Sequence, residues 1–497
     1  MDIAVMIFLC SGLFLGWSLG ANDAANVFGT AVGTRMVRFG VAAMLCSVFV
    51  IVGAVVSGAG ASHTLGKLGA VNALPGSFMA AFAAAFTVYI MTRLGLPVST
   101  SQAIVGAIIG WNLFSGFPTD TATLTKIVST WIACPLLAGV IGVILFKATT
   151  AVVSWSKVHI VRLDAWTRLG LIAAGAFGSY ALGANNIANV MGVFVPANPF
   201  TSFSFAGVVG FTGLQQLFLL GAVAIAVGVV TFSKRVMMTV GGGLVPLSPV
   251  AAWVVVVSHS VVLFLFSSRD LENTLANAGL PTIPLVPVSS SQAVIGAVIG
   301  IALLKGGRGI KWRVLLNISS GWVTTPIVSC AMCFVALFFL QNVFNQQVYR
   351  EASYVLSAAV IERLEKDGIS VDGLTNLEDK RFDSVREFRR ALSEVTDLMN
   401  DKEVGILDRA KIDYLIVDSS TVHRLQGLVS DRQLAAIWPL VGNSYLHPWM
   451  LAEDLAEQSV DWNSRPNTKA NKLFNQRLEQ QRHELYDLSS QPELKSE

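Results

Sequence analysis

Two polar motifs, each present twice, interrupt otherwise apolar stretches of the chain. The first places a hydroxyl-rich run after a proline and reads PVSTSQ at 97–102 and PVSSSQ at 287–292. Proline lacks a backbone donor and favours the first turn of a helix, so each run is predicted to lie at a helix N-terminus. Free backbone N–H groups, the helix dipole and the hydroxyls together form a site for an anion. The residues predicted to bind an oxyanion are Ser99, Thr100, Ser101, Gln102, Ser289, Ser290, Ser291 and Gln292.

The hydroxyls also have a purely structural interpretation, because Ser and Thr in membrane helices commonly bond back to their own helix. The repetition of the whole run, with Pro and Gln included, favours the anion site over this alternative.

The second motif is rich in asparagine and reads GANDAANV at 20–27 and GANNIANV at 183–190. Asp23 is the only carboxylate inside an apolar segment, where it must be solvated, paired or protonated. Amide and carboxylate oxygens on one helix face suit a hard cation such as Na⁺, and a protonatable Asp23 can carry H⁺ instead. The alternative is an amide network that joins helices. The predicted cation-binding residues are Asn22, Asp23, Asn26, Asn185, Asn186 and Asn189.

The apolar part of the sequence carries no other group of side chains with the spacing of a catalytic or metal site. Its single histidines, His63 and His259, are interpreted as packing residues, and so are Cys330 and Cys333. A membrane enzyme would need a nucleophile–base pair or a metal cluster in the spans, so we expect no enzymatic activity. We also expect no cofactor, no metal beyond the possible Na⁺ site, and no nucleic-acid partner.

The surrounding sequence is that of a membrane protein. Of 497 residues, 53% are hydrophobic and 13% are charged, whereas soluble proteins usually carry about 25% charge. Apolar runs of about 20 residues can cross a bilayer. The predicted crossing elements span residues 3–20, 39–58, 77–94, 97–113, 127–147, 168–194, 205–232, 245–267, 283–304 and 322–341. The fourth and the ninth carry Pro, Ser, Thr and Gln, so both are predicted to be broken or re-entrant.

The motifs occur in the same order in both halves, which indicates an internal repeat. Each half has five predicted crossings, so the copies are expected to be inverted relative to each other. We therefore predict an all-α polytopic membrane protein with two inverted-topology repeats, broken or re-entrant helices, and a C-terminal polar, mixed helical domain. The predicted domains are transmembrane repeat 1 at 1–147, a cytoplasmic connecting loop at 148–167, transmembrane repeat 2 at 168–341 and the polar domain at 342–497.

Lysine and arginine in short loops set the orientation of the predicted spans. With the N-terminus outside the cytoplasm, ten crossings place thirteen basic residues inside and three outside. The inside set is Arg35, Arg38, Arg93, Lys147, Lys157, Arg162, Arg168, Lys234, Arg235, Lys305, Arg308, Lys311 and Arg313, and the outside set is Lys67, Lys126 and Arg269. The same count places the C-terminal region outside the cytoplasm. A multi-pass protein of the cell membrane, plasma or inner, is expected.

The four motifs together resemble those of the inorganic phosphate transporter (PiT) family. GANDAANVFGTAVGT and GANNIANVMG are similar to its paired asparagine motifs, and GLPVSTSQAIVGAIIG and PVSSSQAVIGAVIG to its paired serine-rich, re-entrant motifs. The resemblance covers about residues 1–341 and implies symport of inorganic phosphate with Na⁺ or H⁺, and often a homodimer. By motif match, the hydroxyls and glutamines of the first motif would line the phosphate site. The asparagine motifs would serve the cation sites.

The chain departs from the family pattern at three positions. Many members have His where this chain has Gln102 and Gln292, and many have Asp at the position of Asn186. Each change removes a titratable group, so both Na⁺ and H⁺ stay open as the coupling cation. Some relatives carry sulfate, so a permease for sulfate or another oxyanion of the same fold is one alternative. An anion channel is an alternative of another class, although a channel has no need of a buried carboxylate.

Overall fold

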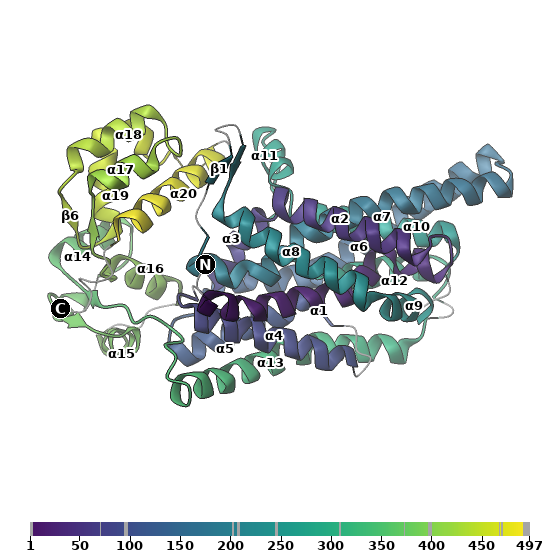
Figure 1. Cartoon of the computed structure of the whole chain (residues 1–497), viewed down its shortest axis with the longest axis horizontal. Helices are drawn as coiled ribbons and strands as arrows, with labels where there is room; N and C mark the ends of the chain where they lie inside the picture. Colours follow the sequence, from purple (N-terminus) through teal and green to yellow (C-terminus); the bar gives the residue numbers. More distant parts are fainter. Residues whose placement is uncertain are drawn as a thin grey trace. The chain divides into compact units, whose positions relative to one another are not determined.

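The computed structural model describes residues 3–69, 71–93, 98–200, 203–205, 209–243, 247–307, 310–371, 373–395, 400–466, 468 and 471–490 (Figure 1). The chain divides into two compact units. The first, here called the membrane unit, comprises Met1–Glu272 and Ile283–Arg350. The second, the C-terminal unit, comprises Asn273–Thr282 and Glu351–Glu497.

Helices build almost all of the membrane unit. They are α1 (Ile3–Gly33), α2 (Phe39–Ser57), α3 (Ala59–Leu68), α4 (Leu74–Arg93), α5 (Thr100–Ser115), α6 (Thr121–Ser156), α7 (Ile160–Met191), η1 (Gly192–Ala197), α8 (Gly213–Thr231), α9 (Ser233–Gly243), α10 (Pro249–Leu265), α12 (Ser290–Leu304) and α13 (Trp312–Asn342). Helix α11 (Arg269–Asn277) begins in the membrane unit and ends in the C-terminal unit. One antiparallel hairpin, β1 (Phe203–Phe205) with β2 (Val209–Phe211), precedes α8.

Six of the described helices, namely α1, α2, α4, α6, α8 and α13, are individually long and apolar enough to cross a membrane, and the bent pair α10 and α11 adds a seventh. The chain is therefore a multi-pass membrane protein. Helices α5 and α12 have 16 and 15 residues. At 1.5 Å per residue both are shorter than a hydrocarbon core of about 30 Å. They occupy the fourth and ninth predicted crossings, which were expected to be broken.

The lipid-facing side of α6 shows why such helices need a bilayer. Ile132, Leu136, Val140 and Ile144 are 56–66% exposed and follow one another at intervals of four residues. This spacing places them in one stripe along the helix. An apolar stripe of this length is stable against acyl chains rather than water.

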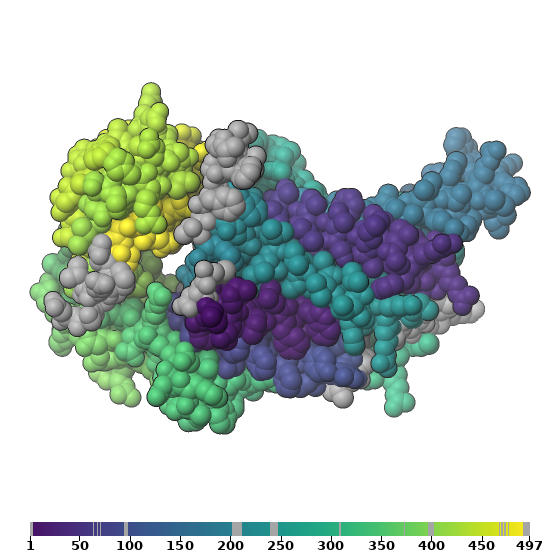
Figure 2. Space-filling model, in the orientation of Figure 1, coloured from purple at the N-terminus to yellow at the C-terminus, as the bar shows by residue number. Residues whose placement is uncertain are grey.

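Three element boundaries differ from the sequence prediction. Helix α1 does not end near residue 20 but continues through the asparagine motif to Gly33, because neighbouring helices enclose its polar side chains. The seventh predicted crossing, at 205–232, begins as the β1–β2 hairpin and becomes helical only at Gly213. Residues 148–167, expected as a loop, are helical except for 157–159, and these ends of α6 and α7 project beyond the rest of the membrane unit (Figures 1 and 2).

Several glycines lie very close to the backbone of a neighbouring helix, and some of these contacts come in matched pairs. A Cβ atom on Gly106 of α5 would lie 2.1 Å from the Pro326 carbonyl oxygen of α13. A Cβ atom on Gly296 of α12 would lie 2.1 Å from the Pro135 carbonyl oxygen of α6. Each short helix therefore packs, backbone to backbone, against the proline of a long helix from the other half of the sequence.

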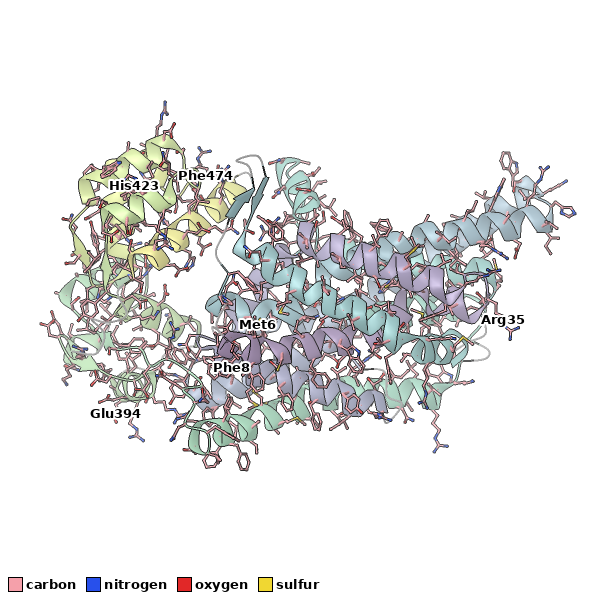
Figure 3. All side chains as sticks on the ribbon, in the orientation of Figure 1. Met6, Phe8, Arg35, Glu394, His423 and Phe474 are labelled. Carbon is pink, nitrogen blue, oxygen red and sulfur yellow. The ribbon has the colours of Figure 1, made fainter. Side chains whose placement is uncertain are left out.

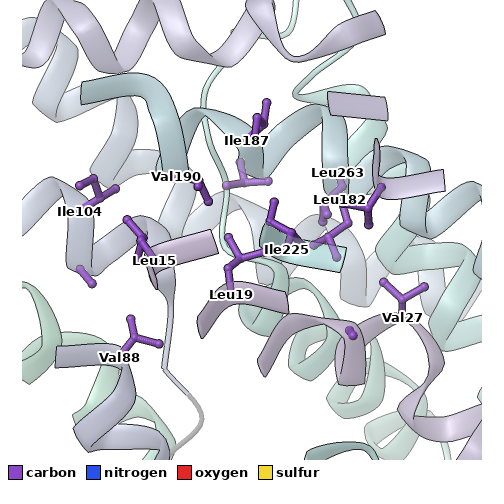
Figure 4. Packing of buried hydrophobic residues seen from close by; sticks show 14 of the residues in the cluster. Leu15, Leu19, Val27, Val88, Ile104, Leu182, Ile187, Val190, Ile225 and Leu263 are labelled. Atoms are coloured by element: carbon purple, nitrogen blue, oxygen red, sulfur yellow. The ribbon is translucent and has the colours of Figure 1, made fainter. Parts of the chain in front are cut away.

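The asparagine motifs also pack against neighbouring helices through a glycine that lies close to a backbone carbonyl. Gly20 of α1 approaches the carbonyl of Ile225 in α8, and Gly183 of α7 approaches the carbonyl of Val50 in α2. Around these contacts, Leu19 and other buried aliphatic side chains of α1, α7, α8 and α10 fill the core (Figure 4). Because only glycine permits such close approach, the motif glycines fix the depth at which the asparagines lie.

The C-terminal unit contains two successive strand–helix–strand–helix segments. The first contains β3 (Tyr354–Val355), α14 (Ala358–Lys366), η2 (Leu374–Leu377), β4 (Arg381–Phe382), α15 (Val385–Val395) and α16 (Asn400–Ala410). The second contains β5 (Leu415–Ile416), α17 (Ser419–Leu425), α18 (Asp431–Ile437), η3 (Trp438–Leu440), β6 (Ser444–Tyr445), α19 (Pro448–Gln458), η4 (Val460–Trp462) and α20 (Lys472–Ser489). Strands β3 and β4 pair antiparallel, as do β5 and β6.

Candidate anion and cation site

Both hydroxyl runs begin a helix, as their sequence predicts. Ser99 is the N-cap of α5 and its hydroxyl accepts a hydrogen bond from the Gln102 backbone at 3.4 Å. Ser289 caps α12 in the same way, accepting from the Gln292 backbone at 3.3 Å. Pro287 stands two residues before its cap, outside the first turn, and Pro97 lies outside the described residues. The hydroxyls of both runs therefore surround a helix N-terminus that carries free N–H groups.

The two N-termini are directly linked inside the membrane unit. The Ser101 hydroxyl donates to the Val288 carbonyl at 3.0 Å, and the Ser291 hydroxyl donates to the Val98 carbonyl at 3.4 Å. Each bond joins the last serine of one run to the valine that precedes the first serine of the other. Two segments almost 200 residues apart in the sequence thus form one buried cluster.

The asparagine motifs connect to this cluster with the halves exchanged. Asn26 of the first half donates to the Ser290 hydroxyl at 3.0 Å, and Asn189 of the second half donates to the Ser101 hydroxyl at 2.8 Å. Every residue of the predicted anion and cation sets is between 0 and 8% exposed. All of them lie in the same buried polar region, and hydrogen bonds join most of them into several groups.

Asparagine side chains also support the non-helical segments that precede the short helices. Asn185 donates to the Val286 carbonyl at 3.1 Å and accepts from the Val288 backbone N–H at 2.9 Å. Asn22 donates to the Val98 carbonyl at 3.4 Å. These bonds satisfy backbone groups that a membrane interior would otherwise leave unpaired.

Asp23 and its counterpart Asn186 give the two halves different charges. The Asp23 carboxylate accepts from the Asn22 amide at 2.9 Å, and Asn186 accepts from the Asn189 amide at 2.8 Å. Asp23 is 3% exposed and Asn186 1% exposed. An ionised carboxylate at this depth requires a cation or a proton, whereas the amide does not.

Several buried polar atoms of the network have no partner among the described residues. They are the hydroxyl oxygen of Thr100, the Oε1 atoms of Gln102 and Gln292, the Nδ2 atom of Asn186 and the Oδ1 atom of Asn189. Buried polar groups in native proteins are nearly always paired, so such a concentration points to bound ligands. The hydroxyl and the Nδ2 group can donate to an anion. The three amide oxygens can accept from a protonated anion or bind a cation.

His259 belongs to the network although the sequence indicated only a packing role. Its Nε2 atom lies 2.9 Å from the Ser290 hydroxyl oxygen, and the side chain is fully buried in α10. The sequence could have indicated this polar role, because His259 stands between Ser258 and Ser260 in an otherwise apolar helix. The side chain of His63 lies outside the described residues.

Comparisons with known proteins identify the family of the chain. The sequence profile of the phosphate transporter family matches residues 19–272 and 278–475. The match continues into the C-terminal unit, beyond residue 341, where the resemblance of the motifs ended. A protein of Methanocaldococcus jannaschii named as a phosphate permease is 25% identical over 335 residues, covering 67% of this chain and 97% of that protein.

Two further relatives bear on fold and on substrate. The solved structure of a sodium-dependent phosphate transporter has a TM-score of 0.54 at 23% identity, covering 68% of this chain and 99% of that chain, and supports the fold. A sulfate permease of Bacillus subtilis is 26% identical over 371 residues, covering 72% of this chain and 93% of that protein.

Proposed function

The chain belongs to the phosphate transporter family, and from this premise we propose that it is a secondary active transporter that carries inorganic phosphate together with Na⁺ or H⁺. The observation that carries the proposal is the linked pair of helix N-termini, each lined by hydroxyls and contacted by an asparagine of the opposite half. Uncharged donors of this kind bind a tetrahedral anion without holding it as an arginine clamp would. Release on the far side therefore stays fast.

Coupling follows from the charge of Asp23. A carboxylate and a phosphate in one buried network repel each other, because the low-dielectric surroundings screen charge poorly. A cation bound at Asp23 and its neighbouring amides, or a proton on Asp23, removes this repulsion. Each ion then favours binding of the other, which is the condition for symport. In this proposal Asn22, Asn26, Asn185, Asn186 and Asn189 supply neutral ligands to the cation.

The paired contacts support the two inverted repeats as the device for alternating access. The matched glycine–proline contacts and the matched serine–valine bonds of Ser101 and Ser291 are what a pseudo-two-fold arrangement would produce. The enclosed network corresponds to an occluded state in this proposal. Opening to either side requires the halves to move against each other at these contacts.

Phosphate is favoured over sulfate by the unpartnered oxygens of Gln102 and Gln292. Phosphate at neutral pH carries at least one hydrogen that it can donate to such an oxygen, whereas sulfate carries none. The similarity to a sulfate permease makes sulfate the second candidate.

Uptake of radiolabelled phosphate and sulfate into proteoliposomes, with Na⁺ and H⁺ gradients imposed separately, tests the proposal. We expect phosphate to accumulate when one of the two gradients is present and sulfate to be taken up much more slowly. Phosphate flux that is independent of both gradients would identify a channel. Gradient-driven sulfate accumulation without phosphate uptake would establish the sulfate alternative.

A further inference from the structure

We infer that His259 is a positioning residue that orients the Ser290 hydroxyl so that its hydrogen faces the anion. The inference rests on the proposed function, because it assigns a role at the same anion site. It starts from two contacts to one atom. The Ser290 oxygen lies 3.0 Å from Nδ2 of Asn26 and 2.9 Å from Nε2 of His259.

A hydroxyl group has one hydrogen to donate and two lone pairs to accept with. The Asn26 amide nitrogen can only donate, so it occupies one lone pair of Ser290. The role of the second contact depends on which imidazole nitrogen of His259 carries the hydrogen.

With the hydrogen on Nε2, His259 donates to the second lone pair and both acceptor positions of Ser290 are filled. The serine hydrogen then has no competing acceptor in this pair of contacts and is free for the anion. With the hydrogen on Nδ1, His259 would instead take the serine hydrogen. Its Nδ1–H would also remain a buried donor, because Nδ1 has no partner among the described residues. In the first arrangement Nδ1 is a buried lone pair instead, and because buried N–H groups without a partner are rarer in native proteins than under-satisfied acceptors, the first arrangement is favoured.

The other half of the site lacks this arrangement. Ser101 accepts from Asn189 but donates its hydrogen to the Val288 carbonyl, so that hydrogen is already in use. Thr100, at the position that corresponds to Ser290, has no hydrogen-bond partner among the described residues. Ser290 is thus a hydroxyl whose direction is set in advance by two side chains, which lowers the cost of ordering it when the anion binds.

The test compares two amide substitutions of His259 by uptake kinetics in proteoliposomes. The amide of His259→Gln reaches the place of Nε2 and can still donate to Ser290, whereas the amide of His259→Asn reaches only the place of Nδ1. We expect His259→Asn to raise the KM for phosphate about tenfold with little change in kcat, as loss of one hydrogen bond to a charged ligand predicts. We expect His259→Gln to stay within about threefold of the unmodified chain. If His259→Asn does not purify as a monodisperse protein, His259→Leu takes its place.

A double-substitution cycle separates an effect through Ser290 from a general loss of packing. Ser290→Ala alone should raise the KM about as much as His259→Asn, and the double variant no further. Ser258→Ala is the matched control, because among the described residues the Ser258 hydroxyl bonds to the Val254 carbonyl of its own helix alone, and its loss should leave the KM unchanged.

Additive effects of the two substitutions, or equal effects of His259→Gln and His259→Asn, would overturn the inference. If the unmodified chain takes up sulfate instead of phosphate, the same comparison is made with sulfate, since the argument concerns the oxyanion oxygen. Uptake of neither anion by the unmodified chain would overturn the proposed function and this inference with it.

Discussion

In the proposed mechanism, Asp23 couples binding of phosphate to binding of a cation or a proton. Asp23→Asn makes both halves neutral with almost no change in shape, since Asn186 already occupies the corresponding position in α7. Without the carboxylate, the cation or proton loses the charge that attracts it, and binding of phosphate no longer depends on it. We expect gradient-driven phosphate uptake in proteoliposomes to fall at least tenfold while the protein still inserts and purifies.

The control for this prediction is Asp164→Asn in the exposed part of α7. Within the described part of the chain Asp164 forms just one exposed ion pair, with Arg168 at 3.4 Å, and such pairs contribute little. Its substitution removes the same charge from the chain and should leave uptake unchanged. Full gradient-driven uptake by Asp23→Asn would show that the coupling ion binds elsewhere.

Gln102 and Gln292 determine the preference between phosphate and sulfate, if their unpartnered oxygens accept the phosphate hydrogen. Replacing either by methionine keeps the length of the side chain and removes the acceptor. We expect the ratio of phosphate to sulfate uptake to fall by about tenfold, the value of one hydrogen bond to a charged group. Gln341→Met is the matched control, because Gln341 also has an unpartnered Oε1 among the described residues but lies at the end of α13. Equal losses for both anions would show that the glutamines do not select between them.

At the scale of elements, the short helices depend on glycine contacts that admit no side chain. Gly296→Ala would place a Cβ atom 2.1 Å from the Pro135 carbonyl oxygen, and neither helix backbone can move without disturbing the capping serines. Overpacking of this kind typically costs about 1–3 kcal/mol, and a backbone clash costs more. We expect Gly296→Ala, and likewise Gly106→Ala, to lower the temperature at which the detergent-solubilised protein loses its monodisperse peak.

Gly66→Ala serves as the control for these substitutions. Gly66 lies within α3, and a Cβ atom there would meet nothing within 4 Å. Alanine is favoured over glycine inside a helix by about 1 kcal/mol, so this variant should be as stable as the unmodified protein or more so. Unchanged stability of Gly296→Ala would mean that α12 can shift away from α6 at no cost.

The same elements show what the sequence could and could not predict. The caps Ser99 and Ser289 were predictable, because proline, serine and helix start are local signals within a few residues. The course of α1 beyond residue 20 was not, since its small and amide residues become helical only when other helices enclose them. The link between His259 and Ser290 depends on the packing of α10 against α12, which no local pattern encodes.

At the scale of the whole molecule, the two ends of the membrane unit can be told apart by the residues that lie there. Met6 and Phe8 lie near one end of α1, and Arg35 lies beyond the other (Figure 3). The basic residues predicted to face the cytoplasm include Arg35, Arg93 at the end of α4 and Lys157 between α6 and α7. Figure 1 shows three features at the same end of the membrane unit: the C-terminal end of α1, helix α9, and the junction of α6 and α7.

The chain leaves the membrane unit at the other end. Arg350, its last residue, forms two backbone hydrogen bonds of 2.9 Å with the side chain of Asn72, which precedes α4. The 20 residues of α4 extend about 30 Å from there to Arg93, the thickness of a hydrocarbon core. Asn72 and Arg93 therefore lie at opposite ends of α4, and the location of the C-terminal unit outside the cytoplasm stays a prediction from the loop charges and the crossing count.

Cysteine labelling of intact cells can test this orientation, because the native cysteines all lie in the membrane unit and Cys10 and Cys330 can be replaced by alanine. Ser464→Cys places a thiol at an exposed position of the C-terminal unit, and Ser156→Cys places one at the exposed end of α6. We expect a membrane-impermeant maleimide to label Ser464→Cys in intact cells and Ser156→Cys only after permeabilisation. The reverse pattern would invert the whole topology. Protection of both sites in intact cells would require an even number of crossings between them, in place of the five predicted, and would place the C-terminal unit in the cytoplasm.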